Sequence, residues 1–321
     1  MYNEKGIGKV LITGGAGFIG SNLAHILIND GHYVRILDNF STGKMDNIRS
    51  LMGYKNFHLI EGDIRSMKTC VEACSGIDIV FHEAALGSVT RSVNNPIVSN
   101  DVNLNGMLNM LIAARDNHVH KFIYASSSSV YGDISSPFKS EGYEGNPLSP
   151  YAITKISCEY YANIFYKLFG LKTIGLRYFN VFGKRQDSEA EYAAVIPVFF
   201  KAALNGEKVV IYGDGNQQRD FTYVSNVIQA NKAAMTTDLE TYGEIFNVGC
   251  GKLTSVAELV KMIFRLVGKI PEINYQKERK GDVRIAAAQL DKIQKSLGYK
   301  PCHYIEEGLK MTLDWYRTRI I

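Results

Sequence analysis

The sequence is poor in cysteine, and its cysteines form no recognisable pairs. There are five in 321 residues, an odd number without a Cys-x-x-Cys spacing, so the sequence predicts neither a disulfide framework nor a zinc or other metal site. The first residues run into a strand pattern and show no secretory pattern. We therefore expect a cytoplasmic protein that works in a reducing compartment.

Long apolar runs and blocks of one charge are also missing. The most apolar stretch, residues 193–204, contains Pro197 and Lys201 and is too short to span a bilayer. The formal net charge is +4 without an arginine-rich block, which does not indicate nucleic acid binding. We therefore expect no membrane and no nucleic acid partner, whereas an anionic small molecule such as a nucleotide diphosphate is compatible with this charge.

Short apolar segments alternate with helical patterns in the first half of the chain. Continuous apolar runs separated by helices are typical of strands buried on both faces. They predict an α/β fold with a Rossmann-type doubly wound parallel sheet. A helix is predicted over residues 18–29, and strands are predicted over residues 10–13, 33–37, 58–60, 79–82, 122–125 and 173–176.

The pattern of residue types along the sequence changes after residue 178. Aromatic residues, glycines and charges become mixed, and helical patterns follow at residues 255–267 and 304–316. We expect a first domain over residues 1–178 and a smaller C-terminal α/β lobe over residues 179–321, which closes over the carboxyl edge of the sheet. A segment near residues 222–247 is expected to return to the first domain.

A glycine-rich loop lies between the first predicted strand and the first predicted helix. Gly14 would form the tight turn, Gly17 would let a pyrophosphate approach the helix N-terminus, and Gly20 would let helix and strand pack closely. Asp38 ends the second strand, where a carboxylate can accept a hydrogen bond from an adenosine ribose and repel a 2′-phosphate. The pattern therefore predicts NAD rather than NADP. Asp63, after the third strand, could meet the adenine edge, although a plain loop aspartate is an alternative.

Tyr151 and Lys155 are the strongest catalytic signal. Of the nineteen tyrosines, only Tyr151 has a lysine four places later. Residues i and i+4 share a helix face, so the ammonium can lie beside the phenol and favour its phenolate form. Such a phenolate is a metal-free base that can take a proton from a sugar hydroxyl while hydride leaves the same carbon. Taken alone, the spacing also fits a surface Tyr and Lys.

A run of four serines, Ser126 to Ser129, follows the predicted strand at residues 122–125. It should lie at the carboxyl edge of the sheet, where such sheets bind ligands. A hydroxyl there can relay a proton between a substrate and Tyr151. The alternative is a serine-rich loop that makes local backbone hydrogen bonds.

The order of these motifs resembles the extended short-chain dehydrogenase/reductase family over residues 10–291. The glycine loop, Asp38, residues 82–85, Asn103, Ser127, the Tyr-x-x-x-Lys pair and residues 177–180 carry the resemblance. Within that family, residues 38–43, 177–183 and 218–221 look like nucleotide-sugar 4-epimerases. The resemblance implies NAD as a tightly bound cofactor and a UDP-sugar as substrate.

The resemblance also implies a role for individual residues, by position. The implied catalytic residues are Ser127, Tyr151 and Lys155. Asn103 is implied to hold the lysine and the active-site helix in place. The implied cofactor-binding residues are Gly14, Gly17, Phe18, Ile19, Gly20, Asp38, Asn39, Phe40, Ser41, Thr42, Gly43, Asp63, Ile64, Ala84, Ala85, Asn103, Ser126, Tyr151, Lys155 and Tyr178. The implied substrate-binding residues are Gly87, Ser88, Ser127, Ser128, Ser129, Asn180, Gln186, Ala194, Val195, Tyr212, Arg219, Arg279, Asp282 and Ala286.

Ser128 and Ser129 indicate which reaction follows oxidation of the sugar. The related dehydratases place an Asp-Glu pair at these two positions, and the related decarboxylases usually have a Glu at the second. Neither serine can replace those acids, so the 4-keto sugar has no evident onward chemistry except return of the hydride. The resemblance therefore implies a 4-epimerase.

Small residues at two positions indicate which sugar the site accepts. In the epimerases, a residue four places after the ribose-binding aspartate gates the sugar pocket, and a small one admits an N-acetyl group. That position is Ala286, and Ala194 would be another small wall, so the resemblance is to UDP-N-acetylglucosamine 4-epimerases. Gln289 departs from the usual pattern, in which an aspartate follows Ala288. A UDP-glucose or UDP-uronic-acid 4-epimerase and, more remotely, a non-catalytic NAD-binding module stay open.

The resemblance implies a homodimer as well. Two helices of each subunit, expected at residues 97–116 and 151–169, would form a four-helix bundle. Apolar and aromatic residues such as Ile156, Tyr160, Phe165 and Leu168 lie on the second helix. Burial of these side chains within one subunit is the alternative.

Overall fold

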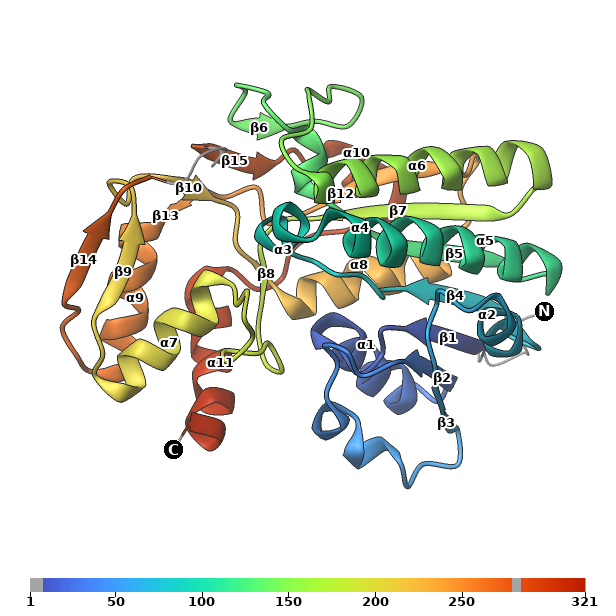
Figure 1. The fold of residues 1–321 in the computed structure, drawn as a ribbon, viewed down its shortest axis with the longest axis horizontal. Coiled ribbons are helices and arrows are strands. Elements are labelled where there is room, and N and C mark those ends of the chain that lie inside the picture. The colour runs from blue at the N-terminus through green and yellow to red at the C-terminus, as the bar shows by residue number, and fades with distance from the viewer. Residues whose placement is uncertain (1–7, 279–283, 321) are drawn as a thin grey trace.

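A parallel sheet of seven strands forms the centre of the larger lobe in the computed structural model, which describes residues 8–278 and 284–320 (Figure 1). The strand order is β12-β7-β5-β4-β1-β2-β3, the doubly wound arrangement in which ligands bind at the carboxyl ends of the strands. The predicted fold class is confirmed. The strands are β1 (Lys9–Thr13), β2 (Tyr33–Asp38), β3 (Phe57–Glu61), β4 (Ile79–His82), β5 (Lys121–Ser127), β7 (Lys172–Tyr178) and β12 (Glu244–Val248).

Apolar side chains on both faces of the sheet explain why helices cover it on both sides. Val10 and Ile12 of β1 belong to one core and Leu11 to the other, because successive strand residues point to opposite faces. The first core includes residues of α1 (Phe18–Asn29) and α8 (Val224–Thr236). The second includes residues of α2 (Met67–Cys74), α5 (Gly106–Asp116) and α6 (Pro150–Phe169), and α5 and α6 run side by side in Figure 1.

The chain enters α5 through a continuous helical segment. It begins at α4 (Pro96–Asn100), passes through one π-helical turn, η3 (Asp101–Asn105), and continues as α5. The predicted helix over residues 97–116 therefore lies within this segment, and α6 contains the predicted helix over residues 151–169. Shorter helical segments on this lobe are α3 (Val89–Asn94), η1 (Met45–Asn47), η2 (Arg49–Leu51) and η4 (Ser128–Tyr131).

A smaller lobe lies beside the carboxyl edge of the sheet, on the left of Figure 1. Its helices are α7 (Val195–Asn205), α9 (Val256–Val267) and α11 (Ile305–Ile320), and β9 (Val209–Tyr212) pairs with β14 (Ile273–Gln276). A second sheet has the order β13-β10-β15-β6, where β6 comes from the first half of the chain. The remaining elements are β6 (Phe138–Lys139), β8 (Val181–Phe182), β10 (Gln218–Arg219), β11 (Thr222–Tyr223), β13 (Thr254–Ser255), β15 (Ile285–Ala288) and α10 (Asp291–Leu297).

Some predicted boundaries were wrong for identifiable reasons. The predicted strand at residues 122–125 ends two residues too early, because Ser126 and Ser127 pair with Arg177 and Tyr178 on β7. The helix expected from residue 255 starts one residue later, because the Ser255 side chain caps it in a capping box with Glu258. The helix expected to end at residue 316 continues to residue 320.

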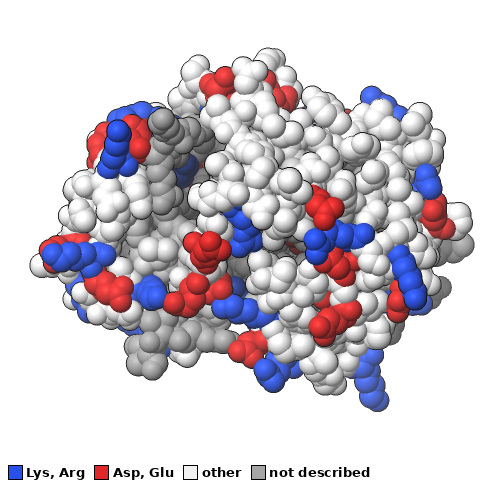
Figure 2. Space-filling model, in the orientation of Figure 1, with Lys and Arg blue, Asp and Glu red and all other residues white. Residues whose placement is uncertain are grey.

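The path of the chain between the lobes bears on the predicted domains. After β11, α8 packs against α1, and β12 joins the large sheet beside β7. We propose the division at residue 178, with residues 222–247 belonging to the first domain. On the face in Figure 2, Lys and Arg side chains are interspersed with Asp and Glu. Within the described residues, no helix combines the length and apolar character needed to cross a membrane.

Candidate active site

A cleft of about 820 Å³ follows the carboxyl edge of the large sheet and reaches the smaller lobe. It is lined by the loops after β1, β2, β3 and β4, by the end of β5, and by the first turns of α6. On the other side it reaches β10 and β15. Most of the predicted site residues therefore meet in one cavity.

The glycine loop leaves no room for a side chain at Gly14 or Gly20. Gly14 has a φ of +66° and its N–H donates to Leu37 O at 2.8 Å, so the chain turns sharply in a conformation that favours glycine. A Cβ on Gly14 would lie 2.8 Å from the Ala84 backbone, and one on Gly20 would overlap the Gly14 carbonyl oxygen. This bare backbone at the start of α1 fits the pyrophosphate of a dinucleotide.

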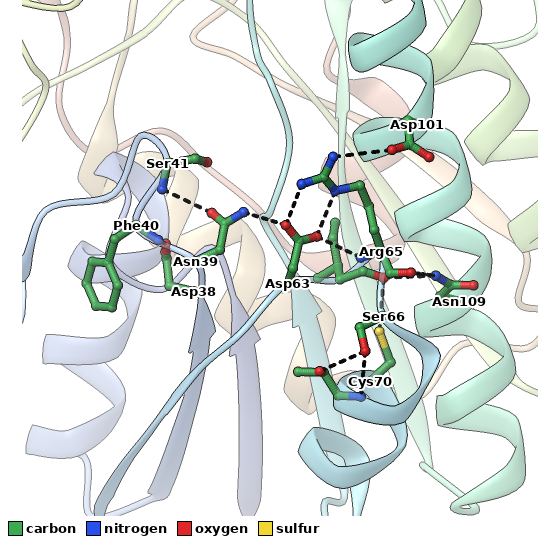
Figure 3. A network of polar contacts seen from close by, with 12 residues as sticks. Asp38, Asn39, Phe40, Ser41, Asp63, Arg65, Ser66, Cys70, Asp101 and Asn109 are labelled. Carbon is green, nitrogen blue, oxygen red and sulfur yellow. Dashed lines mark hydrogen bonds and ion pairs between the residues drawn. The ribbon is translucent and has the colours of Figure 1, made fainter.

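Asp38 ends β2 and lines the cleft (Figure 3). Its carboxylate accepts hydrogen bonds from the N–H groups of Ala16 and Phe40, both at 2.8 Å. Burial raises the pKa of Asp38, and these two N–H groups oppose the rise. The two bonds fix the carboxylate at the wall of the cleft. The residues present thus fit NAD as cofactor.

A polar network continues from Asp38 along the cleft wall (Figure 3). Asn39 donates to Asp63 at 2.8 Å, and Arg65 binds both oxygens of the same carboxylate. Hydrogen bonding from Arg65 lowers the pKa of Asp63 to about 2. Arg65 also reaches Asp101, at 3.3 Å. Asn39 and Asp63, two predicted cofactor-binding residues, are therefore anchored to one another.

The structure brings Tyr151, Lys155 and Ser127 to the same cleft. Tyr151 lies in the first turn of α6, which Ser149 caps, and its N–H also donates to Ser92 Oγ at 3.0 Å. Lys155 Nζ lies 5.9 Å from the centre of the Tyr151 ring and donates to Ala125 O at 2.7 Å. The bond to β5 holds the ammonium beside the phenol ring.

A buried ion pair fixes the catalytic helix against the sheet. Arg177 on β7 lies 2.7 Å from Glu159 on α6, and both side chains are almost fully buried. Ser126 donates to the same glutamate at 2.5 Å, and Glu144 lies 2.5 Å from Arg177 on the other side. The network therefore ties α6 to the ends of β5 and β7, next to Ser127 and Tyr178.

Asn103 lies at the π-helical turn and reaches two neighbouring segments. Its side chain accepts from Leu86 N–H at 2.7 Å and donates to Leu86 O and to Thr154 Oγ1, both at 3.3 Å. Thr154 precedes Lys155 on α6. Asn103 thus contacts the active-site helix through Thr154, the residue before Lys155.

The far end of the cleft is built by the smaller lobe. Arg219 on β10 is paired with Ala286 on β15, and both line the cleft with Asn180 and Ala194. Asn180 donates to Asp220 O at 3.1 Å. The predicted Arg279 and Asp282 lie outside the described residues.

Several other predicted residues lie beside the cleft rather than on its wall. Ser88 caps α3, and Val195 starts α7. The Phe40 ring points away from the polar network in Figure 3. Among the residues that the structure describes, the predicted ones that do not line the cleft are Phe40, Gly43, Ser88, Asn103, Val195 and Tyr212.

Sequence reasoning overlooked two charged residues on the cleft wall, Glu83 and Lys139. Glu83 follows the buried strand β4 directly, and an acidic residue at that position is itself a signal of a ligand edge. Lys139 is buried on β6, where its ammonium donates to Ile134 O and Ser136 O at 2.6 and 2.7 Å. No local pattern marks Lys139, since β6 meets its partner β15 only through the tertiary fold.

Comparison with known proteins matches residues 10–249 to the NAD dependent epimerase/dehydratase family. The UDP-glucose 4-epimerase of Mycolicibacterium smegmatis is 36% identical over 97% of this chain and 99% of its own length. A UDP-N-acetylglucosamine 4-epimerase from Methanobrevibacter ruminantium, solved in complex with UDP-N-acetylmuramic acid, is 38% identical with a TM-score of 0.91, covering 98% of this chain and 99% of that one. The UDP-glucuronic acid 4-epimerase from Bacillus cereus, solved with UDP-glucuronic acid and NAD, is 32% identical with a TM-score of 0.90, covering 97% and 99%.

The chain therefore belongs to the NAD-dependent epimerase/dehydratase family. The predictions of this family, of an epimerase and of NAD as the cofactor are confirmed. Its relatives act on different UDP-sugars.

Proposed function

We propose that the chain is a 4-epimerase of UDP-N-acetylhexosamines, which interconverts UDP-N-acetylglucosamine and UDP-N-acetylgalactosamine through a transient 4-keto sugar. The observation that carries the proposal is the meeting of Tyr151, Lys155 and Ser127 with the glycine loop and Ala286 in one cleft. One bound UDP-sugar would therefore contact the base Tyr151, the cofactor at the glycine loop and the small side chain of Ala286.

Tyr151 would take the proton of the sugar 4-hydroxyl, and the Lys155 ammonium, anchored on Ala125 O, would favour the phenolate. Ser127 would hold the same hydroxyl from the end of β5. NAD, held by the glycine loop and Asp38, would supply a reversible hydride acceptor for carbon 4. After the 4-keto sugar rotates about its diphosphate link, Tyr151 gives the proton back.

The sugar preference rests on the width of the cleft near β15. Ala286 contributes only a methyl side chain to the wall of the cleft, and Ala194 adds a second small residue to that wall. Such a wall leaves space for an acetamido group. Arg219 lies beside Ala286 through strand pairing and is suited to the diphosphate, since a guanidinium binds phosphate oxygens in a bidentate manner.

The proposal is tested by incubating the purified chain with UDP-N-acetylglucosamine, without added NAD, and recording proton NMR spectra over time. Appearance of the 4-epimer supports it. Parallel incubations with UDP-glucose and UDP-glucuronic acid measure the preference among the sugars of the known relatives. Turnover of UDP-glucuronic acid alone, or of no sugar nucleotide, would reject the assignment.

We also propose a cytoplasmic homodimer. Large apolar side chains are exposed on neighbouring helices: Ile97 on α4 is 80% exposed, and Tyr160 and Leu168 on α6 are 71% and 68% exposed. An apolar face of this kind supports an isologous contact between two copies. All five cysteines are free, which suits a reducing compartment. Sedimentation equilibrium tests the dimer, and a monomer at micromolar concentration would reject it.

A further inference from the structure

Glu83 occupies a position between the cofactor cradle and the catalytic pair. It follows β4 directly, and β4 lies next to β1 at the point where the strand order reverses. A Cβ on Gly14 would lie 3.0 Å from the Glu83 carbonyl carbon, so the two backbones are in contact. Glu83 lines the cleft together with Tyr151 and Lys155.

An oriented chain of hydrogen bonds holds the Glu83 carboxylate. The Asn231 side-chain amide on α8 donates one hydrogen bond to Val227 O, at 2.9 Å, and a second to the Tyr178 hydroxyl, at 2.8 Å. Because the Tyr178 oxygen accepts from Asn231, its own hydrogen points to Glu83 Oε1, at 2.7 Å. Burial raises the pKa of Tyr178, which therefore stays a donor. This chain of hydrogen-bond donors therefore ends on the Glu83 carboxylate, which is the acceptor.

The surroundings of Glu83 keep its charge responsive to a ligand. Burial raises the pKa of Glu83 to about 7, and the Tyr178 hydroxyl and the Lys155 ammonium oppose that rise. A cation that enters the cleft next to this carboxylate favours its ionised form. A dinucleotide whose pyrophosphate lies at the glycine loop and whose reactive carbon lies near Tyr151 must pass its nicotinamide half beside Glu83.

We propose that Glu83 is a further cofactor-binding residue, whose carboxylate, held by Tyr178 and Asn231, favours the oxidised cationic nicotinamide over the reduced neutral one. This inference rests on the cofactor site of the proposed function. Removing the charge should weaken binding of NAD⁺ about tenfold relative to NADH, which corresponds to ~1.4 kcal/mol.

A merely structural Glu83 makes a different prediction. Glutamine has nearly the same shape, and its carbonyl oxygen can accept the Tyr178 hydrogen bond. If only that bond matters, Glu83→Gln leaves the preference between the two redox forms unchanged. If the charge matters, Glu83→Asp keeps the wild-type preference and Glu83→Gln loses it.

The test equilibrates the full-length chain with mixtures of NAD⁺ and NADH, removes free dinucleotide, and quantifies both bound forms by chromatography. Glu72→Gln is the matched control, because Glu72 is an exposed glutamate on α2, away from the cleft. We expect the ratio of bound NAD⁺ to NADH to fall about tenfold in Glu83→Gln and to stay at the wild-type value in Glu72→Gln and Glu83→Asp.

An unchanged ratio in Glu83→Gln, or an equal loss of both forms, would overturn the inference. Circular dichroism establishes that each variant is folded. A shifted ratio in Glu83→Asp, which keeps the charge, would also contradict the inference, and this outcome is measurable even if Glu83→Gln does not fold. Since no sugar is present, the ratio is measured whether or not the chain epimerises UDP-N-acetylglucosamine. Failure here is thus distinct from failure of the proposed function.

Discussion

Replacing Glu159 by Gln tests whether the buried ion pair holds the catalytic helix on the sheet. Glu159 and Arg177 are 6% and 3% exposed, and removing one partner of a buried pair costs ~3–5 kcal/mol. In this variant Glu144, which lies 2.5 Å from Arg177, still partly compensates the buried charge of Arg177. We therefore expect a loss near the lower limit, about 3 kcal/mol.

This loss translates into a shift of the melting temperature. The entropy of unfolding is about 2.1 cal/mol/K per residue, which gives ~0.7 kcal/mol/K for the chain of 321 residues. A loss of ~3 kcal/mol then lowers Tm by about 4 to 5 °C. Calorimetric melts of the full-length variant and wild type measure this shift directly.

The matched control is again Glu72→Gln, which removes one exposed carboxylate from α2. Surface changes of this kind stay within about 0.5 kcal/mol, so its Tm should move by less than ~1 °C. Equal Tm values for the two variants would refute the reasoning, because the buried pair would then contribute no more than a solvated carboxylate.

Three further outcomes are expected. Gly20→Ala should lose bound NAD and ~1–3 kcal/mol of stability, because the new methyl meets the Gly14 carbonyl and the Gly15 Cα at 2.9 Å. In the control Gly53→Ala, the new methyl meets no atom within 4 Å, so this variant should keep both its bound NAD and its stability. Equal NAD content in the Gly20 and Gly53 variants would contradict the proposed role of the glycine loop in binding the cofactor. Ala286→Tyr should suppress turnover of UDP-N-acetylglucosamine at least ~10-fold more than that of UDP-glucose. Equal losses of turnover for the two sugars in NMR assays would contradict the role of Ala286 as a gate. Burial raises the pKa of Asp220 from 3.8 to about 6, so its stabilising contribution is present at low pH and lost as pH rises through about 6. In urea melts, the stability of wild type relative to Asp220→Asn should fall by about 2 to 3 kcal/mol from about pH 4 to 7, and a difference independent of pH would contradict this.

Local patterns in the sequence predicted much of the large sheet and the core of the site. The glycine loop lies between a strand and a helix that are adjacent along the chain, and Tyr151 and Lys155 are one helical turn apart. Such features depend on short-range geometry. The helix over residues 18–29 was therefore predicted to its ends.

Features that depend on distant contacts could not be predicted in the same way. The end of β5 at Ser127 is set by its pairing with β7. The Glu83 side chain acquires its role from Tyr178, which lies 95 residues later and meets it only in the folded chain. In the same way, Glu159 and Arg177 carry no pattern that marks them as partners across two elements.

The most direct test of the account is the replacement of Tyr151 by Phe, because the proposed mechanism assigns all proton transfer at carbon 4 to that hydroxyl. Tyr54→Phe is the control, since Tyr54 is 47% exposed and lies outside the cleft. NMR should show turnover of UDP-N-acetylglucosamine reduced about 10²- to 10⁴-fold in Tyr151→Phe, with NAD still bound, and normal turnover in the control. A Tyr151→Phe variant that keeps most of its activity would contradict the central claim.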